Sequence, residues 1–322
     1  MRRIATVGVA SGQAGRHGGC WRGPLVLRNS PGLRRYCAAE GLQLVWHALL
    51  QADERVTKLE AVTGLCRQAA RFASALVRHH QPFLFLGGDH ATAMGVWQGV
   101  MGALPGSRRL GLIWIDAHMD AHTFETTPSG NVHGMPVAGL LGQGDRLLSR
   151  VYGGMHHLRP ENLVLLGVRS YEPAEQRLLE RLGVRVIGMA ELNEPGALRS
   201  RLVETAARLS RQVDVLGISI DLDAVDPRDA PAVGVPEPGG IAGDELVAAL
   251  AAIAAVPRLV GMEIAEFCPR HEREEKTVQL IGRLIAALYG EGGENRTRYR
   301  SFGSAGEGIK STSSPIFRSQ AS

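Results

Sequence analysis

The sequence contains no run of 18 or more apolar residues, so it predicts no membrane-spanning helix in this chain of 322 residues. It also has no recognisable secretory leader. Met1-Arg2-Arg3 passes directly into a strand-like run over 4–9, without the longer apolar stretch and cleavage site of a signal peptide. We therefore expect a cytoplasmic protein that makes no use of the membrane.

Cysteine is scarce, and the four that are present (Cys20, Cys37, Cys66 and Cys268) show no Cys-x-x-Cys spacing. Without a secretory signal, we expect them to be free thiols in a reducing compartment. Cys268 stands two residues after Glu266, but a buried and unreactive thiol is the default expectation there.

The chain has little excess charge of either sign, with a formal net charge of +4. Residues 291–322 hold five Arg or Lys and three Glu, so half of that excess falls in this segment. The remainder is small and dispersed, which argues against a nucleic-acid partner. Aromatic residues are also few, at 5%, whereas Ala, Gly and Leu are frequent, which suits helices packed closely on a sheet.

Apolar, β-rich runs alternate with helical patterns along most of the chain. Near-continuous apolar strands of this kind predict a parallel sheet covered on both faces, here a three-layer α/β/α sandwich with a mainly parallel sheet of about eight strands. We expect strands near 4–9, 42–46, 83–86, 110–116, 162–167, 184–187, 213–221 and 258–264. We expect helices near 57–80, 92–103, 134–141, 173–182, 196–210, 243–254 and 275–289.

The periodicity ends near Gly290, which predicts one catalytic domain over 1–290 and a disordered tail over 291–322. Within the domain, 123–132 and 224–243 are rich in Pro, Gly, Thr and Ser. We expect both segments to be long loops over the strand ends, where substrate contacts commonly lie.

Acidic residues and histidines cluster just after three of the expected strands. The clusters are Gly87-Gly88-Asp89-His90, Asp116-Ala117-His118-Met119-Asp120 and Asp221-Leu222-Asp223. Side chains two apart on an extended segment point to the same face, and ligand sites in parallel sheets lie beyond the carboxyl ends of the strands. The clusters are therefore expected to converge on one point.

Carboxylates and imidazoles crowded together would repel or be poorly solvated unless cations compensated them. Oxygen donors with only two imidazoles favour Mn²⁺ or a similar ion over a thiolate-bound zinc. Two such ions, roughly 3.5 Å apart, can hold a bridging water and lower its pKa. The pattern therefore predicts a two-metal site that hydrolyses a polar carbon centre.

The motifs GGDH, DAHMD, SGNVHGMP and SIDLDAVDP, followed by a late Glu, occur in an order that resembles the ureohydrolase family, most closely arginase. The resemblance covers roughly 4–290. It implies two Mn²⁺ per chain, a metal-bridging hydroxide that attacks the guanidinium carbon of L-arginine to give ornithine and urea, and assembly as a trimer or hexamer. The metal ligands that it implies are His90, Asp116, His118, Asp120, Asp221 and Asp223.

The resemblance also implies roles for residues around the substrate. Asp120 and His133 would relay protons, and Glu266 would fix the guanidinium through charge-assisted hydrogen bonds. Ser129 and Asn131 match residues that contact the α-carboxylate of arginine.

Two positions depart from the arginase pattern at the end of the pocket that reads the head group. His122 stands where arginases usually have Asn, and Glu172 stands where they have an Asp near the α-amino group. The alternatives that stay open are another ureohydrolase (agmatinase, guanidinobutyrase or formimidoylglutamase) and a non-catalytic metal-binding homologue. A related zinc deacetylase would not have the histidine of the GGDH motif, so His90 argues against it.

Overall fold

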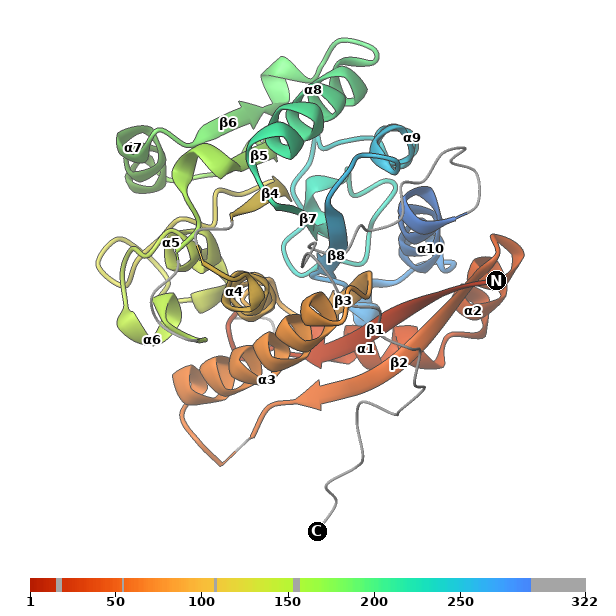
Figure 1. Ribbon diagram of the computed structural model, residues 1–322, viewed down its shortest axis with the longest axis horizontal. Helices are drawn as coiled ribbons and strands as arrows, with labels where there is room; N and C mark the ends of the chain where they lie inside the picture. The colour runs from red at the N-terminus through yellow and green to blue at the C-terminus, as the bar shows by residue number, and fades with distance from the viewer. Residues whose placement is uncertain (16–18, 54, 107–108, 153–156, 291–322) are drawn as a thin grey trace, which may run out of the picture.

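The computed structural model describes residues 1–15, 19–53, 55–106, 109–152 and 157–290, and the expected tail over 291–322 lies outside them. These residues form one eight-stranded sheet with the order β2-β1-β3-β8-β7-β4-β5-β6, and every pair of neighbours is parallel (Figure 1). The strands are β1 (Arg2–Ala10), β2 (Leu42–Gln51), β3 (Phe83–Gly87), β4 (Leu110–Ile115), β5 (Leu163–Val168), β6 (Arg185–Gly188), β7 (Val215–Asp221) and β8 (Leu259–Ala265).

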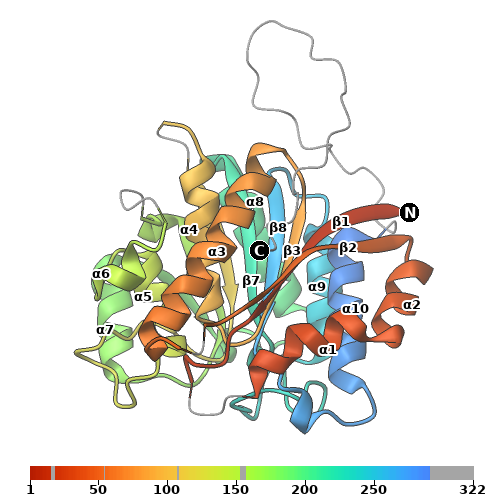
Figure 2. The same ribbon diagram turned by 90° about the horizontal axis from the view of Figure 1, so that it is seen from below.

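Helices cover both faces of the sheet, which gives the expected three layers (Figure 2). One face packs against α3 (Lys58–Arg78), α4 (Thr92–Ala103), α5 (Pro136–Leu140), α6 (Arg146–Ser149) and α7 (Pro173–Leu182). The other face packs against α1 (Gly23–Asn29), α2 (Pro31–Ala39), α8 (Ala197–Gln212), α9 (Gly243–Ile253) and α10 (Lys276–Tyr289).

The central strands are apolar because both of their faces are covered. Every residue of β3, β4 and β7 is buried, and alternate side chains of each strand join the apolar clusters on the two sides of the sheet. The eight expected strands and the sandwich architecture are thus confirmed. Among the described residues, no helix has the length and apolar character needed to cross a membrane.

Three helices were not expected from the apolar periodicity: α1, α2 and α6. They are short, so they offer too few turns for a periodic pattern. Their starts are nevertheless encoded locally, because Pro24 and Pro31 lie in the first turns of α1 and α2 and the Ser30 side chain accepts a hydrogen bond from Leu33 N. The helix expected over 134–141 is also shorter, and a 3-10 turn over Val132–Gly134 precedes it.

Candidate active site

Four adjacent strands bring the polar clusters together at one edge of the sheet. The strands β3, β8, β7 and β4 are consecutive neighbours in the sheet although their order in the chain is different. Because they are parallel, their carboxyl ends meet at the same edge. The segments after these ends carry His90, Glu266, the pair Asp221 and Asp223, and the Asp116–Asp120 cluster.

A first group of donors surrounds the Nδ1 atom of His90. This nitrogen lies 3.1 Å from Asp116 Oδ2, 3.3 Å from Asp120 Oδ2 and 3.1 Å from Asp221 Oδ2. All four side chains are buried. Burial alone would lower the pKa of His90, but Glu263 and the surrounding aspartates raise it well above its usual value. Without a cation, a proton on the imidazole balances these carboxylates.

A second group surrounds the Nδ1 atom of His118. This nitrogen lies 3.1 Å from Asp223 Oδ2 and 3.6 Å from Asp116 Oδ1. Asp116 therefore contributes one oxygen to each group and stands between them. Its backbone-facing oxygen Oδ1 also accepts a hydrogen bond from His118 N at 2.7 Å, which holds the carboxylate in place.

The donor set fits a pair of divalent cations. Asp120 Oδ2 is buried and has no hydrogen-bond partner among the described residues, despite its distance of 3.3 Å from His90 Nδ1. Burial and the neighbouring Asp116 raise the pKa of Asp120 to about 7, and burial with Asp223 and Asp116 raises that of Asp221 well above its usual value. Each raised pKa means that the ionised carboxylate is unfavourable in this surrounding, and a bound cation would stabilise it.

Residues that the sequence argument did not use orient His90. Its Nε2 atom lies 3.1 Å from Ser219 Oγ, and Ser219 in turn donates a hydrogen bond to Glu263. Thr92 Oγ1 donates to the other Glu263 oxygen at 3.2 Å, and Glu263 is fully buried. These hydrogen bonds hold the His90 imidazole with its Nδ1 atom toward the carboxylates. A charged residue in the apolar run of β8 is the sequence signal that would have found it.

The outer nitrogen of His118 has an acidic neighbour from one of the long loops. His118 Nε2 lies 3.4 Å from Glu237 Oε1, and Ser170 Oγ donates to the same oxygen at 3.3 Å. Glu237 belongs to 224–243, which was expected to be a loop over the strand ends. The segment over 224–243 therefore contributes directly to the surroundings of the second group.

A cavity of about 110 Å³ lies beside the two groups. Glu266 forms part of its wall: Oε1 accepts a hydrogen bond from His90 N at 2.9 Å and lies 3.4 Å from His133 Nδ1, while Oε2 accepts from Cys20 Sγ at 3.1 Å. The residues lining the cavity are Gly12, Gly15, Cys20, Asp89, Asn131, His133, Gly234, Val235 and Glu266.

The Glu266 and His133 side chains are coupled by charge. Burial alone would raise the pKa of Glu266, but the hydrogen bond with His133 lowers it. Burial would lower the pKa of His133, but Glu266 and nearby aspartates raise it to about 9. His133 therefore carries a proton near neutral pH in the metal-free protein.

The two departures from the arginase pattern lie against each other. His122 Nε2 is 2.8 Å from Glu172 Oε2 and 3.4 Å from Glu175 Oε2, and its Nδ1 is 3.1 Å from Thr126 Oγ1. Glu175 was not singled out in the sequence. Its carboxylate closes a capping box with Glu172 at the start of α7, and the Glu-Pro-x-Glu spacing is the signal for it.

Of the two residues expected to contact a substrate carboxylate, only one lines the cavity. Asn131 lines the cavity, whereas Ser129 is exposed and does not line it. Ser129 Oγ accepts a hydrogen bond from Asn131 N at 3.2 Å, so the two residues belong to one local turn.

The backbone is strained at two of these positions. Asp120 has φ of 51° and Glu266 has φ of 67°, in the left-handed region that non-glycine residues seldom adopt. Glu266 directly follows β8 and donates a backbone hydrogen bond to Gly88 O, and Asp120, in the segment after β4, accepts one from Val137 N. Strain of this kind concentrates at functional sites.

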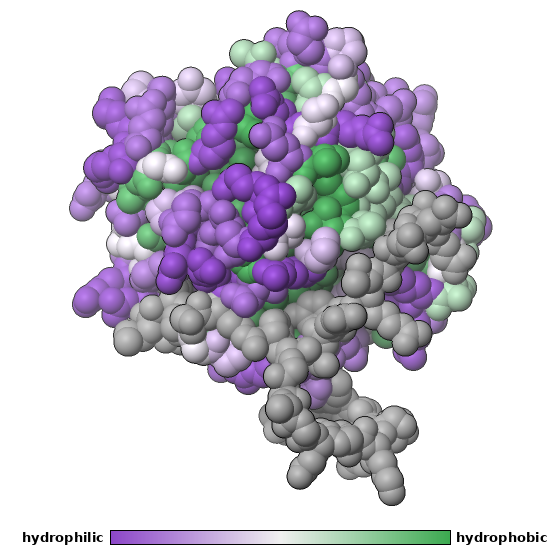
Figure 3. All heavy atoms as spheres, turned by 45° about the horizontal axis from the view of Figure 1, so that its top comes forward, coloured by the Kyte–Doolittle hydropathy of each residue, from purple (hydrophilic) through white to green (hydrophobic). Residues whose placement is uncertain are grey.

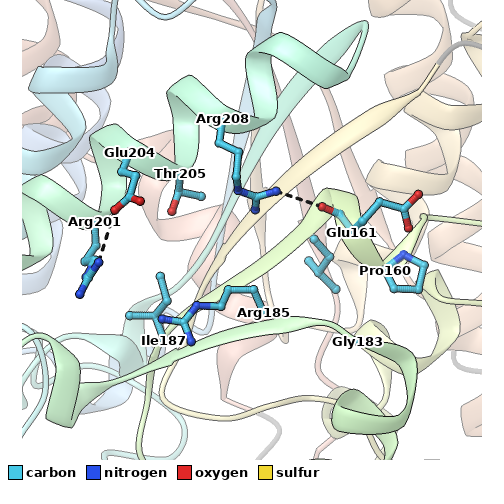
Figure 4. Close-up of a pocket in the computed structure, with 10 residues that line it drawn as sticks. Pro160, Glu161, Gly183, Arg185, Ile187, Arg201, Glu204, Thr205 and Arg208 are labelled. Carbon is cyan, nitrogen blue, oxygen red and sulfur yellow. Dashed lines mark hydrogen bonds and ion pairs between the residues drawn. The ribbon is translucent and has the colours of Figure 1, made fainter.

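A larger hollow of about 340 Å³ lies elsewhere, between α8 and the starts of β5 and β6 (Figure 4). Its charged side chains have partners: Arg208 donates to the carbonyl oxygen of Glu161, and Arg201 pairs with Glu204. It lies at the amino ends of the strands and holds no histidine, so it is not the candidate site.

Comparisons with known proteins identify the family of this chain. A model of the arginase family matches residues 2–290. The arginase of Bacillus caldovelox is 37% identical over 241 residues, which cover 75% of this chain and 79% of that protein. The crystal structure of the Bacillus cereus arginase superimposes with a TM-score of 0.82 at 31% identity, covering 91% of this chain and all of the other.

A structure of the formimidoylglutamase of Bacillus subtilis also shares the fold, with a TM-score of 0.71 at 22% identity, covering 89% of this chain and 86% of the other. Its similarity is therefore to the architecture alone, whereas the match over residues 2–290 and the 37% identity define the family. The chain belongs to the arginase family.

Proposed function

We propose that this protein hydrolyses the guanidinium group of L-arginine to L-ornithine and urea. The observation that carries the proposal is the convergence of six candidate metal ligands beside a cavity whose wall contains the Glu266 carboxylate. The relatives named arginase, which are up to 38% identical to this chain, support arginine as the substrate.

We assign two Mn²⁺ ions to the site, because the donors are mainly carboxylates. His90, Asp116, Asp120 and Asp221 would hold one ion, and His118, Asp116 and Asp223 would hold the other, as the distances around the two Nδ1 atoms suggest. When bound, the ions supply an activated water as the nucleophile.

Glu266 would bind and orient the guanidinium. A carboxylate offers two acceptors to a planar cation, and charge-assisted bonds of this kind are strong. In the structure Glu266 accepts from Cys20 and lies beside His133, so the substrate would exchange these partners for its own N–H groups.

Asp120 and His133 would carry the protons. Asp120 Oδ2 lies in the donor group around His90 and has no hydrogen-bond partner among the described residues. This suits a residue that accepts a proton from the attacking water. His133 lines the same cavity, and its pKa is raised in the metal-free protein, so a protonated His133 would donate to the departing amine.

The head-group end of the pocket decides between arginine and other guanidines. His122 is buried between Glu172 and Glu175, and an imidazole N–H at this position would offer a donor to a carboxylate, while the exposed part of Glu172 would attract an amine. Both groups suit an amino-acid head group. Agmatinase, guanidinobutyrase or formimidoylglutamase activity is the second candidate, because His122 and Glu172 change the shape of this region.

We also propose that the protein works in the cytoplasm as a trimer or hexamer, as the family resemblance implies. Sedimentation velocity over a range of protein concentrations would determine the assembly. A species with the mass of the single chain throughout that range would contradict the oligomer.

The test of the reaction is a substrate panel with Mn²⁺-loaded protein: L-arginine, agmatine, 4-guanidinobutyrate and formiminoglutamate. Urea and formamide are assayed separately, and Asp221→Asn protein is the control for contaminating activity. Urea and ornithine from arginine alone support the proposal. Urea from another guanidine, or formamide, would replace the substrate and keep the two-metal site, and no product from any of the four would overturn the proposed activity.

A further inference from the structure

Two cysteines from opposite ends of the chain meet at the wall of the cavity. Cys20 begins a 3-10 turn before α1, and Cys268 follows Phe267 after the end of β8. Both side chains are buried, and they lie close enough for Cys268 to raise the pKa of Cys20 and for Cys20 to lower the pKa of Cys268. Cys37 and Cys66, the other two, lie elsewhere, on α2 and α3.

Close approach of the two backbones brings these thiols together. A Cβ built on Gly19 would lie 2.5 Å from Cys268 Sγ, and one built on Gly23 would lie 2.5 Å from the carbonyl oxygen of Phe267. Side chains at these two positions would force the segments apart. Cys268 N also donates to the carbonyl oxygen of Ala232 at 2.8 Å, which fixes the segment that carries the second thiol.

The pair is connected to the candidate active site through Glu266. Cys20 Sγ donates to Glu266 Oε2 at 3.1 Å, and Cys20 and Glu266 line the same cavity of about 110 Å³. A small oxidant that enters the cavity reaches the thiol pair from the Cys20 side. On the other side, the Cys20 thiol, His271 and Arg270 lower the pKa of Cys268 and favour its thiolate, the form of cysteine that attacks a peroxide.

We propose that Cys20 and Cys268 are a redox-active pair that a small peroxide converts to a disulfide, and that this modification disables Glu266. An S–S bond is about 2.05 Å long, so forming it pulls Cys20 toward Cys268 and away from Glu266. Glu266 Oε2 then loses the thiol that holds it before substrate binds, and only Oε1 keeps its hydrogen bond, from His90 N. The effect on activity rests on the proposed role of Glu266, whereas the modification itself does not.

The reaction balances with hydrogen peroxide as the oxidant. The Cys268 thiolate attacks one peroxide oxygen; the O–O bond breaks, hydroxide leaves and Cys268 becomes a sulfenic acid. The Cys20 sulfur then attacks the sulfenic sulfur of Cys268, the S–O bond breaks, and the hydroxyl group leaves as water with the Cys20 proton. The two sulfurs together lose two electrons and the peroxide gains two.

The experiment treats Mn²⁺-loaded full-length protein with hydrogen peroxide, blocks the remaining thiols and maps unreduced peptides by mass spectrometry. We expect a peptide pair linked through Cys20 and Cys268, a fall in turnover of at least tenfold, and recovery with dithiothreitol. Cys268→Ser should keep its turnover and lose this reversible response. Cys37→Ser is the matched control and should respond as the wild type does.

Each result decides the proposal. Free Cys20 and Cys268 after oxidation, or irreversible oxidation of either one alone, would overturn the thiol pair. A linked pair with unchanged turnover would overturn the effect on Glu266. If the reduced protein hydrolyses no guanidine, the proposed function fails, and the linked peptide still determines whether the pair forms.

Discussion

At the scale of single residues, the site is a small volume in which buried charges oppose each other. Asp116, Asp221 and Asp223 all lie out of water within reach of two histidines. Buried carboxylates so close together are unfavourable unless protons or cations compensate them. The residues that surround them, Ser219 and Glu263 among them, fix which atoms face the centre.

Replacing Asp120 by Asn should lower kcat at least 100-fold in Mn²⁺-saturated protein, the usual scale of losing a positioned proton acceptor. The KM should change much less, because the amide keeps the size of the side chain and Glu266 is untouched. Steady-state urea production with metal content measured on the same sample tests this. Near-wild-type turnover in a fully loaded sample would remove Asp120 from the proton relay.

The change Glu263→Gln should weaken Mn²⁺ binding by about 10–100-fold, the usual effect of losing a residue that orients a metal ligand. Ser219 would lose its charged acceptor, and His90 would lose its fixed tautomer. Metal titration of the stripped protein measures the Kd. Glu245→Gln, on the exposed side of α9, is the control, and equal affinities in the two variants would refute the orienting role.

The contribution of His133 to the stability of the metal-free protein should depend on pH. Its pKa is raised to about 9 in the folded state, against about 6.5 in an unfolded chain. The folded state therefore binds the proton more tightly, so the stabilisation is complete below about pH 6.5 and is lost as pH rises toward 9. Urea unfolding of wild type and His133→Asn at several pH values should show a difference that shrinks with increasing pH; a growing difference would contradict it.

At the scale of elements, glycines set how closely helices approach. A Cβ on Gly95 or Gly99 of α4 would lie 2.3 Å from a carbonyl oxygen of α3, that of Cys66 or of Ala70. The capping box of Thr57 and Glu60 starts α3 at its observed position. The close contact between α3 and α4 fixes the position of α4, which follows β3, and therefore also that of the GGDH turn between them.

Gly99→Ala should lower the Tm although alanine is the better helix former. The gain of about 1 kcal/mol in helix propensity is smaller than the strain of forcing two backbones apart, which costs up to about 3 kcal/mol. Gly64→Ala on α3 is the matched control, because nothing lies within 4 Å of its added Cβ. Thermal unfolding should give a lower Tm for the first and an equal or higher Tm for the second. The reverse order would show that α3 and α4 can separate freely.

At the scale of the whole molecule, the sheet serves as the frame of the site. Its two sides carry separate apolar clusters, and its four central strands, β3, β8, β7 and β4, end at the two groups of candidate metal ligands. The face in Figure 3 is mainly hydrophilic around a smaller hydrophobic area. The two apolar clusters should therefore supply most of the free energy of folding. The buried carboxylates at the carboxyl edge of the sheet should lower it.

Removing the metal should lower the Tm and returning Mn²⁺ should raise it, increasingly with concentration, because a ligand that binds only the folded state stabilises it. The compensation of buried carboxylates adds to the effect. Calorimetry of stripped and reloaded protein measures it, with Asp221→Asn as a variant whose shift should be smaller. Identical Tm values with and without Mn²⁺ would exclude a metal centre at this edge.

The sequence by itself determined the layers, the eight strands and the polar clusters, because apolar runs and turn residues act locally. The position of the clusters after strand ends also followed from the pattern. It could not give the sheet order, since nothing local states that β3 lies beside β8 or that β7 lies beside β4.

Only the tertiary structure decided which side chains meet. It placed Glu263 behind His90, Glu175 behind His122, and Cys20 against Cys268 across 248 positions of the chain. It also fixed the left-handed backbone at Asp120 and Glu266. These features depend on long-range packing that balances burial, charge and strain together, and no local pattern of residues encodes that balance.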